Sequence, residues 1–243
     1  MNSIIHLTSQ KSLDSITSEW DAIAPERDRL ITTNRDDSFT KVLKPWILKR
    51  LQGAARIVDV GCGTGRLTAN LAEQSEFTLG LDPSSVSIKI ARGHDGVSEY
   101  KVSTAEEWIK HNPDASFDLV VANMVLMDAV DLKGLCQAIA KMGDGVRVLA
   151  TITHPAFWPE YWGYASESGF DYLSETYIEG PFRTSSHEFS KVSTHIHRPV
   201  SRYLSEFRSS GLEIVRVDEL RGPEGREVFR FPRFLAFELR NGE

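Results

Sequence analysis

Three alternate glycines lie where the sequence predicts a strand followed by a helix. In VDVGCGTGR, Gly61, Gly63 and Gly65 follow the apolar run RIVDV and precede the amphipathic run RLTANLAEQ. Glycine adopts backbone conformations that are closed to other residues, and it lets a ligand approach the main chain closely. The segment therefore predicts a loop that binds a small cofactor; the alternative is a tight strand-to-helix turn without a ligand.

The spacing of these glycines argues against two common nucleotide sites. A dinucleotide loop needs G-x-G-x-x-G, but this loop reads G-x-G-x-G and continues with Arg66. The triphosphate loop G-x-x-x-x-G-K-[ST] is missing as well, because CGTGRL follows Gly61. The sequence therefore disfavours NAD as the cofactor and disfavours hydrolysis of nucleoside triphosphates.

Short apolar runs alternate with amphipathic runs from Arg56 to about Thr153. The apolar runs RIVDV, FTLGLD, EYKVS, FDLVVAN and VRVLATIT predict strands, and the runs between them predict helices. Strands that are apolar on both faces and joined by helices need a parallel sheet covered on both sides. After His197 a helix is predicted over 200–210, followed by two strands, LEIVRV and FLAFEL, that form an antiparallel edge pair. The predicted fold class is α/β, with a doubly wound, mostly parallel sheet.

Other segments flank or interrupt this pattern. Residues 1–52 carry helix-type spacing broken at TTNRDD, and in residues 155–192 the strand and helix alternation stops. Nine of the 23 aromatic residues fall between Phe157 and Phe182. We therefore divide the chain into an N-terminal helical segment (1–52), a Rossmann-like core (53–154 and 193–243) and an aromatic-rich cap insertion (155–192). The stretch RGPEGREVFRFPR is expected to be a solvated connection between the last two strands.

Composition limits the partners of the chain. Lys and Arg total 28 against 34 Asp and Glu, for a net charge of −6, whereas binding to a phosphate backbone needs clustered cations. No run reaches the roughly 18 apolar residues that span a bilayer, and the chain does not start with a basic, apolar leader. We expect no nucleic-acid or membrane partner, and a cytoplasmic protein whose Cys62 and Cys136 are reduced thiols.

The motifs resemble those of the class I S-adenosylmethionine-dependent methyltransferases. The first motif of that family is similar to VDVGCGTG, and the resemblance extends over most of the chain. The sequence is also similar to a subgroup of small-molecule enzymes with a TITHPAFW segment, here Thr151 to Trp158, and an HRP triplet, here His197 to Pro199. The resemblance implies a seven-stranded sheet with its last strand antiparallel, and S-adenosylmethionine as the cofactor across the carboxyl ends of the first strands.

The resemblance also implies which residues bind this cofactor. Asp59 and the glycine loop would face its methionine part, and Asp82 would accept hydrogen bonds from both ribose hydroxyls. Asp82 also suits the N-terminus of a helix. Ser103 or Thr104 takes the place of the Asp that the family usually has, and Met124 suits core packing better than ligand contact. The expected cofactor-binding residues are Asp59, Gly61, Cys62, Gly63, Gly65, Asp82, Pro83, Thr104, Ala105, Glu106, Asn123 and Met124.

The cap and the N-terminal helices are expected to enclose the acceptor of the methyl group. The aromatic side chains expected to bind the substrate are Phe157, Trp158, Tyr161 and Trp162, which would present ring faces toward the sulfonium. The alternative is that these rings pack the cap onto the sheet or onto a second subunit. In the N-terminal segment, Trp20, Arg27 and Asn34 would close over the cofactor, unless they belong to an ordinary amphipathic helix pair.

Three histidines could accept the proton that leaves an oxygen or nitrogen acceptor. His154 follows the fifth strand, and His195 and His197 lie in THIHRP, which returns from the cap. His154 could instead form a hydrogen bond that orients the start of the cap. No Cys, Asp or Glu completes a metal site beside His195 and His197, so no metal is expected.

The function expected from these observations is transfer of a methyl group to an oxygen or nitrogen of a small, apolar or aromatic molecule. One alternative keeps the cofactor but methylates a macromolecule. A second alternative is a cyclase or binding protein in which the cofactor is not consumed. A homodimer is possible, and the identity of the acceptor does not follow from the sequence.

Overall fold

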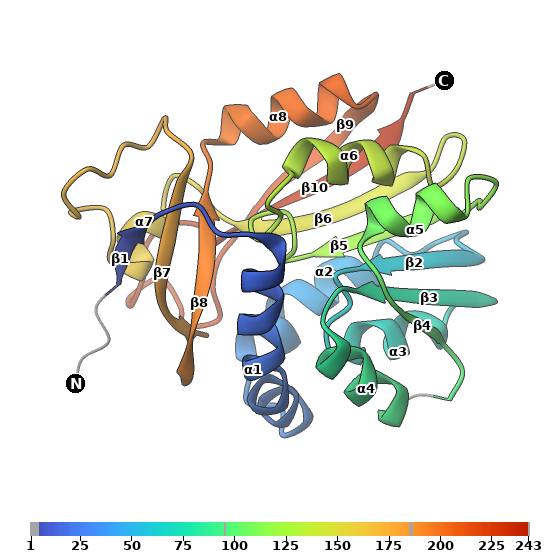
Figure 1. Ribbon diagram of the computed structural model, residues 1–243, viewed down its shortest axis with the longest axis horizontal. Coiled ribbons are helices and arrows are strands. Elements are labelled where there is room, and N and C mark those ends of the chain that lie inside the picture. Colours follow the sequence, from blue (N-terminus) through green and yellow to red (C-terminus); the bar gives the residue numbers. More distant parts are fainter. Residues whose placement is uncertain (1–4, 95, 185–186, 243) are drawn as a thin grey trace.

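Two sheets organise the described residues of the computed structural model, which are 5–94, 96–184 and 187–242. The larger sheet has seven strands in the order β4-β3-β2-β5-β6-β10-β9, and the smaller sheet has three in the order β1-β7-β8 (Figure 1). The strands of the larger sheet are β2 (Arg56–Val60), β3 (Phe77–Asp82), β4 (Glu99–Val102), β5 (Leu119–Asn123), β6 (Arg147–Thr153), β9 (Leu212–Leu220) and β10 (Phe234–Asn241). The smaller sheet contains β1 (His6–Thr8), β7 (Thr176–Arg183) and β8 (Glu188–His197).

The larger sheet confirms the predicted fold class. Strands β4, β3, β2, β5 and β6 are parallel, and β10 is antiparallel to both β6 and β9. The last two strands pair antiparallel as predicted, but only β9 lies at the edge, because β10 inserts between β6 and β9. The strand order reverses at β2, so the loops after β2 and β5 diverge and leave a crevice at the carboxyl edge.

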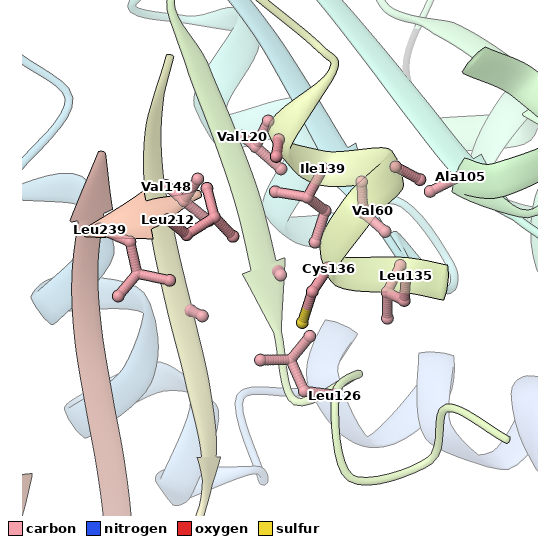
Figure 2. Packing of buried hydrophobic residues seen from close by; sticks show 14 of the residues in the cluster. Val60, Ala105, Val120, Leu126, Leu135, Cys136, Ile139, Val148, Leu212 and Leu239 are labelled. Atoms are coloured by element: carbon pink, nitrogen blue, oxygen red, sulfur yellow. The ribbon is translucent and has the colours of Figure 1, made fainter. Parts of the chain in front are cut away.

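Successive residues of a strand point to opposite faces of the sheet. Both sets are apolar here, so helices cover both faces of this sheet. Val60 and Val120 face α5, α6 and α8, where Cys136 and Ile139 of α6 fill the centre of the core (Figure 2). Ile57 and the other inward residues of the opposite face pack against α2 and α3. The helices of the core are α2 (Lys44–Leu48), α3 (Arg66–Ala72), α4 (Ser85–His94), α5 (Ala105–His111), α6 (Leu132–Ala140) and α8 (Val200–Ser209).

The N-terminal segment is helical, as its spacing predicts. Helix α1 (Leu13–Thr32) ends at the first residue of the TTNRDD break, and a π-helical segment η1 (Ser38–Leu43) leads into α2. Helix α1 packs against β8 on one side and α4 on the other, so it stands between the two sheets (Figure 1). Within the described ranges, no helix is long and apolar enough to cross a membrane.

The cap is built around the smaller sheet. It contains α7 (Trp158–Trp162), β7 and β8, and its third strand, β1, comes from the N-terminal segment. Strand β8 continues to His197, five residues beyond the cap boundary expected from the sequence. The smaller sheet thus joins two parts of the chain that the expected division separates.

Candidate active site

A cavity of about 550 Å³ lies between the carboxyl edge of the larger sheet, helix α1 and the cap. Its walls come from the ends of β2, β3 and β5, from α1, and from α7 and β8. The sequence-predicted residues that line it are Asp59, Gly61, Cys62, Gly63, Asp82, Pro83, Thr104, Ala105, Glu106, Asn123, Met124, Trp158, Trp162 and His195. The structure therefore brings most of the expected cofactor residues and part of the cap into one space.

The glycine loop needs its glycines for two different reasons. Gly61 and Gly63 line the cavity with φ of 68° and 54°, in the left-handed region that favours glycine. A Cβ on Gly61 would lie 2.5 Å from the Val125 side chain, whereas one on Gly63 would meet nothing within 4 Å. Gly65 does not line the cavity, and a Cβ there would lie 2.7 Å from the Cβ of Ala91. Gly63 thus leaves backbone open to a ligand, and Gly65 lets α3 and α4 approach each other.

Asp82 joins the end of β3 to the glycine loop. Its two oxygens accept hydrogen bonds from the N–H of Gly63 and from the N–H of Ser84, each at 2.8 Å. Burial raises the pKa of Asp82 to about 6 despite these bonds. Each carboxylate oxygen has a further lone pair, so Asp82 can still accept bonds from a ligand.

Asp59 is a second buried acid in the wall of the cavity. It is the second-last residue of β2, is 1% exposed, and accepts a hydrogen bond from the Thr68 hydroxyl at 2.7 Å. Burial raises its pKa to about 7, and the negative charge of Asp82 adds to this shift. Because a cation stabilises ionised carboxylates, these two acids fit a positively charged guest. S-adenosylmethionine carries a sulfonium and an ammonium group, and its ribose hydroxyls can donate to Asp82.

The loops after β4 and β5 complete the cofactor side. The Thr104 hydroxyl accepts a hydrogen bond from the N–H of Glu107 at 3.2 Å, so this side chain caps α5. The Asn123 side-chain oxygen accepts a hydrogen bond from the Thr151 hydroxyl at 2.8 Å. Met124 follows with φ of 58°, which is uncommon for a residue other than glycine and is often found at functional sites.

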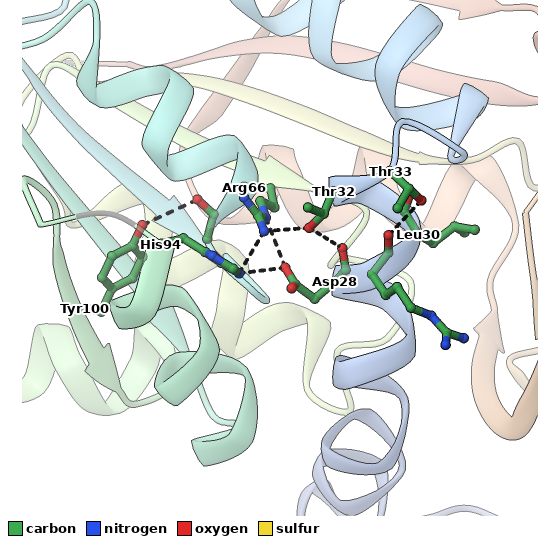
Figure 3. Close-up of polar contacts among 9 residues, drawn as sticks. Asp28, Leu30, Thr32, Thr33, Arg66, His94 and Tyr100 are labelled. Atoms are coloured by element: carbon green, nitrogen blue, oxygen red, sulfur yellow. Dashed lines mark hydrogen bonds and ion pairs between the residues drawn. The ribbon is translucent and has the colours of Figure 1, made fainter.

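Polar contacts hold helix α1 against the cofactor side of the cavity (Figure 3). The Asp28 carboxylate accepts from Arg66 Nε at 3.0 Å and contacts His94 Nε2 at 2.9 Å, while Arg66 Nη2 also donates to the Thr32 hydroxyl. Arg66 follows the glycine loop directly, so these contacts place α1 beside the loop. Of the N-terminal residues expected to close the site, Trp20 and Arg27 line the cavity and Asn34 does not.

Two of the four aromatic residues expected to bind the substrate line the cavity, and two do not. Trp158 and Trp162 line the cavity, whereas Phe157 and Tyr161 do not. Phe157 stacks on Phe231 with ring centroids 4.8 Å apart, and Tyr161 lies under the guanidinium of Arg233 at 4.1 Å. Phe157 and Tyr161 thus pack the start of the cap against the loop before β10, whereas the alternative had them pack onto the sheet or a second subunit.

The three candidate histidines have different surroundings. His195 lines the cavity, and burial lowers its pKa to about 3, so its imidazole is neutral near pH 7. His154 does not line the cavity: its Nε2 lies 3.0 Å from the Glu219 carboxylate and its Nδ1 accepts from the N–H of Ala156 at 3.3 Å. The structure thus places His195 in the cavity and gives His154 two contacts that orient the start of the cap.

His197 and Arg198 connect the cap to the core rather than lining the cavity. His197 contacts the Tyr164 hydroxyl at 3.2 Å and the Tyr172 carbonyl at 3.0 Å. Arg198 is 1% exposed and donates to the carbonyl of Ala129 at 2.7 Å and to that of Leu126 at 3.3 Å. The HRP triplet therefore holds the loop after β5, which carries residues of the cavity wall.

Asp128 and Arg233 are among the residues of the cavity wall that were not singled out from the sequence. Asp128 lies on the loop that Arg198 holds, and burial raises its pKa well above the usual range. Arg233 is 1% exposed, and its Nη1 donates to Glu224 at 2.9 Å. The expectation that the Arg-rich stretch is wholly solvated is therefore wrong for Arg233 and Glu224. The phenylalanines beside Arg233 in VFRFPRF are the sequence signal that could have indicated its burial.

Metal-ligating side chains do not gather in the part of the chain that the structure describes. No group of three or more His, Cys, Asp or Glu side chains there could hold a metal ion.

Cys62 and Cys136 are both buried and free. Burial, together with the charges of Asp82 and Asp59, raises the pKa of the Cys62 thiol well above its usual range, which does not suit a nucleophile.

Comparisons with known proteins find a methyltransferase domain in the chain. A family model described as "Methyltransferase domain" matches residues 58–144. The mitochondrial ubiquinone biosynthesis O-methyltransferase of Bos taurus is 34% identical over 106 residues, which are 40% of this chain and 28% of the bovine protein. The match therefore spans less than a third of that relative.

Solved structures share the fold over most of the chain. An S-adenosylmethionine dependent methyltransferase from Mesorhizobium loti has a TM-score of 0.61 and 26% identity, covering 81% of this chain and 95% of its own. The cyclase SpnF has a TM-score of 0.63 and 15% identity, covering 97% of this chain and 98% of its own, a likeness that concerns the fold alone. The chain contains a methyltransferase domain and has the fold of the S-adenosylmethionine-dependent methyltransferases, which confirms the predicted fold and cofactor.

Proposed function

We propose that this protein transfers the methyl group of S-adenosylmethionine to an oxygen or nitrogen of a small molecule held under the cap. One observation carries the proposal: the same cavity is lined by the glycine loop and Asp82 at the sheet edge and by Trp158, Trp162 and His195 of the cap. Its volume of about 550 Å³ lies in the range of small-molecule sites. Cofactor and acceptor can therefore meet in one enclosed space.

The residues at the sheet edge hold the cofactor. The Asp82 carboxylate accepts from the ribose hydroxyls, and the open backbone at Gly63 lies beside the amino-acid part. Asp59 and Asp82 offset the positive charges of the guest because both are buried carboxylates. When bound, S-adenosylmethionine supplies an electrophilic methyl group on a sulfonium.

The residues of the cap hold and orient the acceptor. Methyl transfer is a direct displacement, so alignment of the acceptor atom and exclusion of water supply much of the acceleration. The rings of Trp158 and Trp162 form an apolar wall that excludes water. The neutral His195 accepts a hydrogen bond from the hydroxyl or amine of the acceptor and so directs the lone pair of that atom toward the cofactor side.

The lining of the cavity favours a small, apolar or aromatic molecule as the acceptor. The cap wall is rich in aromatic rings, and the matched relatives include proteins named as O-methyltransferases, which favours oxygen as the methylated atom. The net charge of −6 does not favour a nucleic acid. A cytoplasmic location and a homodimer stay predictions.

An assay of cofactor turnover tests the proposal. Purified protein is incubated with methyl-labelled S-adenosylmethionine and a small-molecule extract, and S-adenosylhomocysteine and labelled products are counted by mass spectrometry. We expect one S-adenosylhomocysteine for each methylated small molecule, and a lower turnover with Asp82→Ala when the cofactor concentration is near the Kd of the unaltered protein. Label found only in protein or nucleic acid would favour the macromolecule alternative. A product formed without S-adenosylhomocysteine would favour a cyclase.

A further inference from the structure

Two indole N–H groups in the cap wall of the cavity have no hydrogen-bond partner among the described residues. Trp158 is 7% exposed and Trp162 is 3% exposed, and the Nε1 atoms of both are buried and unpaired. A buried donor left unsatisfied costs about 1 to 3 kcal/mol, so buried indoles usually find a partner. Both tryptophans line the cavity, so a ligand that enters it can supply the missing acceptor where an indole ring turns its N–H toward the cavity.

His195 lies beside both indoles. Its ring centroid is 6.4 Å from that of Trp158 and 5.9 Å from that of Trp162, and the two indoles are 6.1 Å apart. The imidazole is neutral and, within the described part of the chain, makes no side-chain hydrogen bond or ion pair. We call Trp158, Trp162 and His195 the Trp-Trp-His cluster; it offers two indole N–H donors and an imidazole that donates at one nitrogen and accepts at the other.

The charges around the Trp-Trp-His cluster favour a neutral ligand group. The guanidinium of Arg233 lies 5.7 Å from the Trp158 ring, but it is paired with Glu224 at 2.9 Å. Arg183, which also lines the cavity, lies 3.7 Å from the Glu188 carboxylate. Each cation therefore has a carboxylate neighbour, although the Nε atoms of Arg183 and Arg233 are buried without a hydrogen-bond partner. A ligand carboxylate would have to compete with Glu188 and Glu224 for these cations in an apolar wall.

We infer that the Trp-Trp-His cluster binds an uncharged oxygen of the methyl acceptor. The inference rests on the proposed function and narrows its substrate class to neutral, largely apolar molecules that carry a carbonyl or hydroxyl oxygen beside a ring or alkyl surface. The oxygen accepts from the indole N–H of Trp158 or Trp162, or from both. A reacting hydroxyl or amine on the same molecule donates to His195. Selection against analogues without the oxygen follows, because those analogues leave buried donors unpaired.

Binding of three small probes tests this inference. Acetophenone carries a neutral carbonyl oxygen, ethylbenzene has a similar size without the oxygen, and benzoate carries a charge. Each is titrated into ¹⁵N-labelled protein saturated with S-adenosylhomocysteine, and the indole N–H resonances are followed by NMR. The variants Trp158→Phe and Trp162→Phe assign the two resonances, because each variant lacks one of them while keeping an aromatic ring.

We expect acetophenone to bind more tightly than ethylbenzene and benzoate and to move the Trp158 or Trp162 N–H resonance downfield. Loss of one hydrogen bond of about 0.5 to 1.5 kcal/mol corresponds to roughly a two- to twelvefold weaker binding of acetophenone in the matching variant. Ethylbenzene affinity should change less than acetophenone affinity. Equal affinity of acetophenone and ethylbenzene, unmoved indole resonances, tighter binding of benzoate, or no binding of acetophenone would each overturn the inference.

A matched variant controls for a general effect of removing an indole. Trp108 lies on α5 and packs on Phe117, away from the cavity wall, so Trp108→Phe should keep the preference for acetophenone over ethylbenzene. The rise in Tm caused by S-adenosylhomocysteine shows that each variant is folded and binds the cofactor. Probe selectivity without methyl turnover would refute the proposed function alone, whereas turnover without this selectivity would refute the inference alone.

Discussion

The Asp82 carboxylate accepts a hydrogen bond from the backbone N–H of Gly63 at 2.8 Å. This bond joins the carboxyl end of β3 to the loop that follows β2, two neighbouring strands of the parallel sheet. The residue proposed to bind ribose is therefore fixed to the loop proposed to bind the amino-acid part. Changes at Asp82 should act on both parts of the cofactor site.

Asp82→Ala should weaken the binding of S-adenosylmethionine by roughly 10- to 100-fold, because hydrogen bonds to charged groups contribute about 1.5 to 3 kcal/mol. Asp82→Asn keeps one acceptor oxygen and should lose less affinity. Isothermal calorimetry measures both dissociation constants. Asp114 is exposed on the loop after α5, so Asp114→Ala serves as a control with unchanged affinity. Unchanged affinity in Asp82→Ala would refute the ribose assignment.

Cofactor binding should tighten as pH rises from about 5.5 to 8. Burial raises the pKa of Asp82 to about 6 and that of Asp59 to about 7, so both acids hold protons at the lower pH. A positively charged ligand favours the ionised carboxylates, so it lowers both pKa values and releases protons on binding.

The free protein should respond to pH in the opposite direction. The native state holds protons on Asp82 and Asp59 that the unfolded chain releases near its ordinary pKa of 3.8. The stability that the two acids contribute is therefore complete below about pH 4 and is lost as pH rises through about 6 to 7. Thermal melts with and without S-adenosylmethionine check both trends. A larger cofactor-induced rise in Tm at about pH 5.5 than at pH 8 would contradict this account.

Arg198→Ala should lower the free energy of unfolding by about 3 kcal/mol or more, because it removes a buried ion-pair member and leaves two loop carbonyls without their donor. Arg198 pairs with Glu175 and donates to Leu126 and Ala129. Urea denaturation measures the loss. Arg202→Ala is the matched control: Arg202 pairs with Glu206 on α8 but is 52% exposed, so its loss should change stability by less than about 1 kcal/mol. Similar losses in the two variants would contradict the role assigned to Arg198.

The core of the fold could be predicted because its signals are local. The apolar runs of β2 to β6 and the helices between them follow from residue periodicity, and the glycine loop follows from Gly61 and Gly63 directly after a buried strand. The position of β10 between β6 and β9 depends on contacts between distant segments. Sequence order predicts the antiparallel pairing of the last two strands, but it does not decide which of them lies at the edge.

The sequence could not predict which residues of the cap line the cavity. His154, His195 and His197 are the same residue type near the same sheet edge, yet only His195 of these three lines the cavity. Its place depends on the pairing of β8 with β7, in which His195 lies opposite Ile178. The backbone of His154 instead bonds to the carbonyl of Arg233, 79 positions further along the chain, at 2.9 Å. Such pairings arise from tertiary contacts that no short segment encodes.

His195 and His154 should therefore differ in their effects on catalysis. His195→Ala should lower kcat for the acceptor by at least about tenfold while leaving the dissociation constant of S-adenosylmethionine within about twofold, because His195 contacts the acceptor side of the cavity. His195→Gln keeps a hydrogen-bond acceptor and should retain more activity.

His154→Ala removes a contact with Glu219, whose side chain is 58% exposed, so it should cause a small loss of stability and near wild-type turnover. Steady-state kinetics with the acceptor found by the turnover assay, together with calorimetry for the cofactor, separate these effects. A larger loss of kcat in folded His154→Ala than in His195→Ala would contradict the role assigned to His195, because His154 lies outside the cavity and can lower turnover only through the groups that it positions.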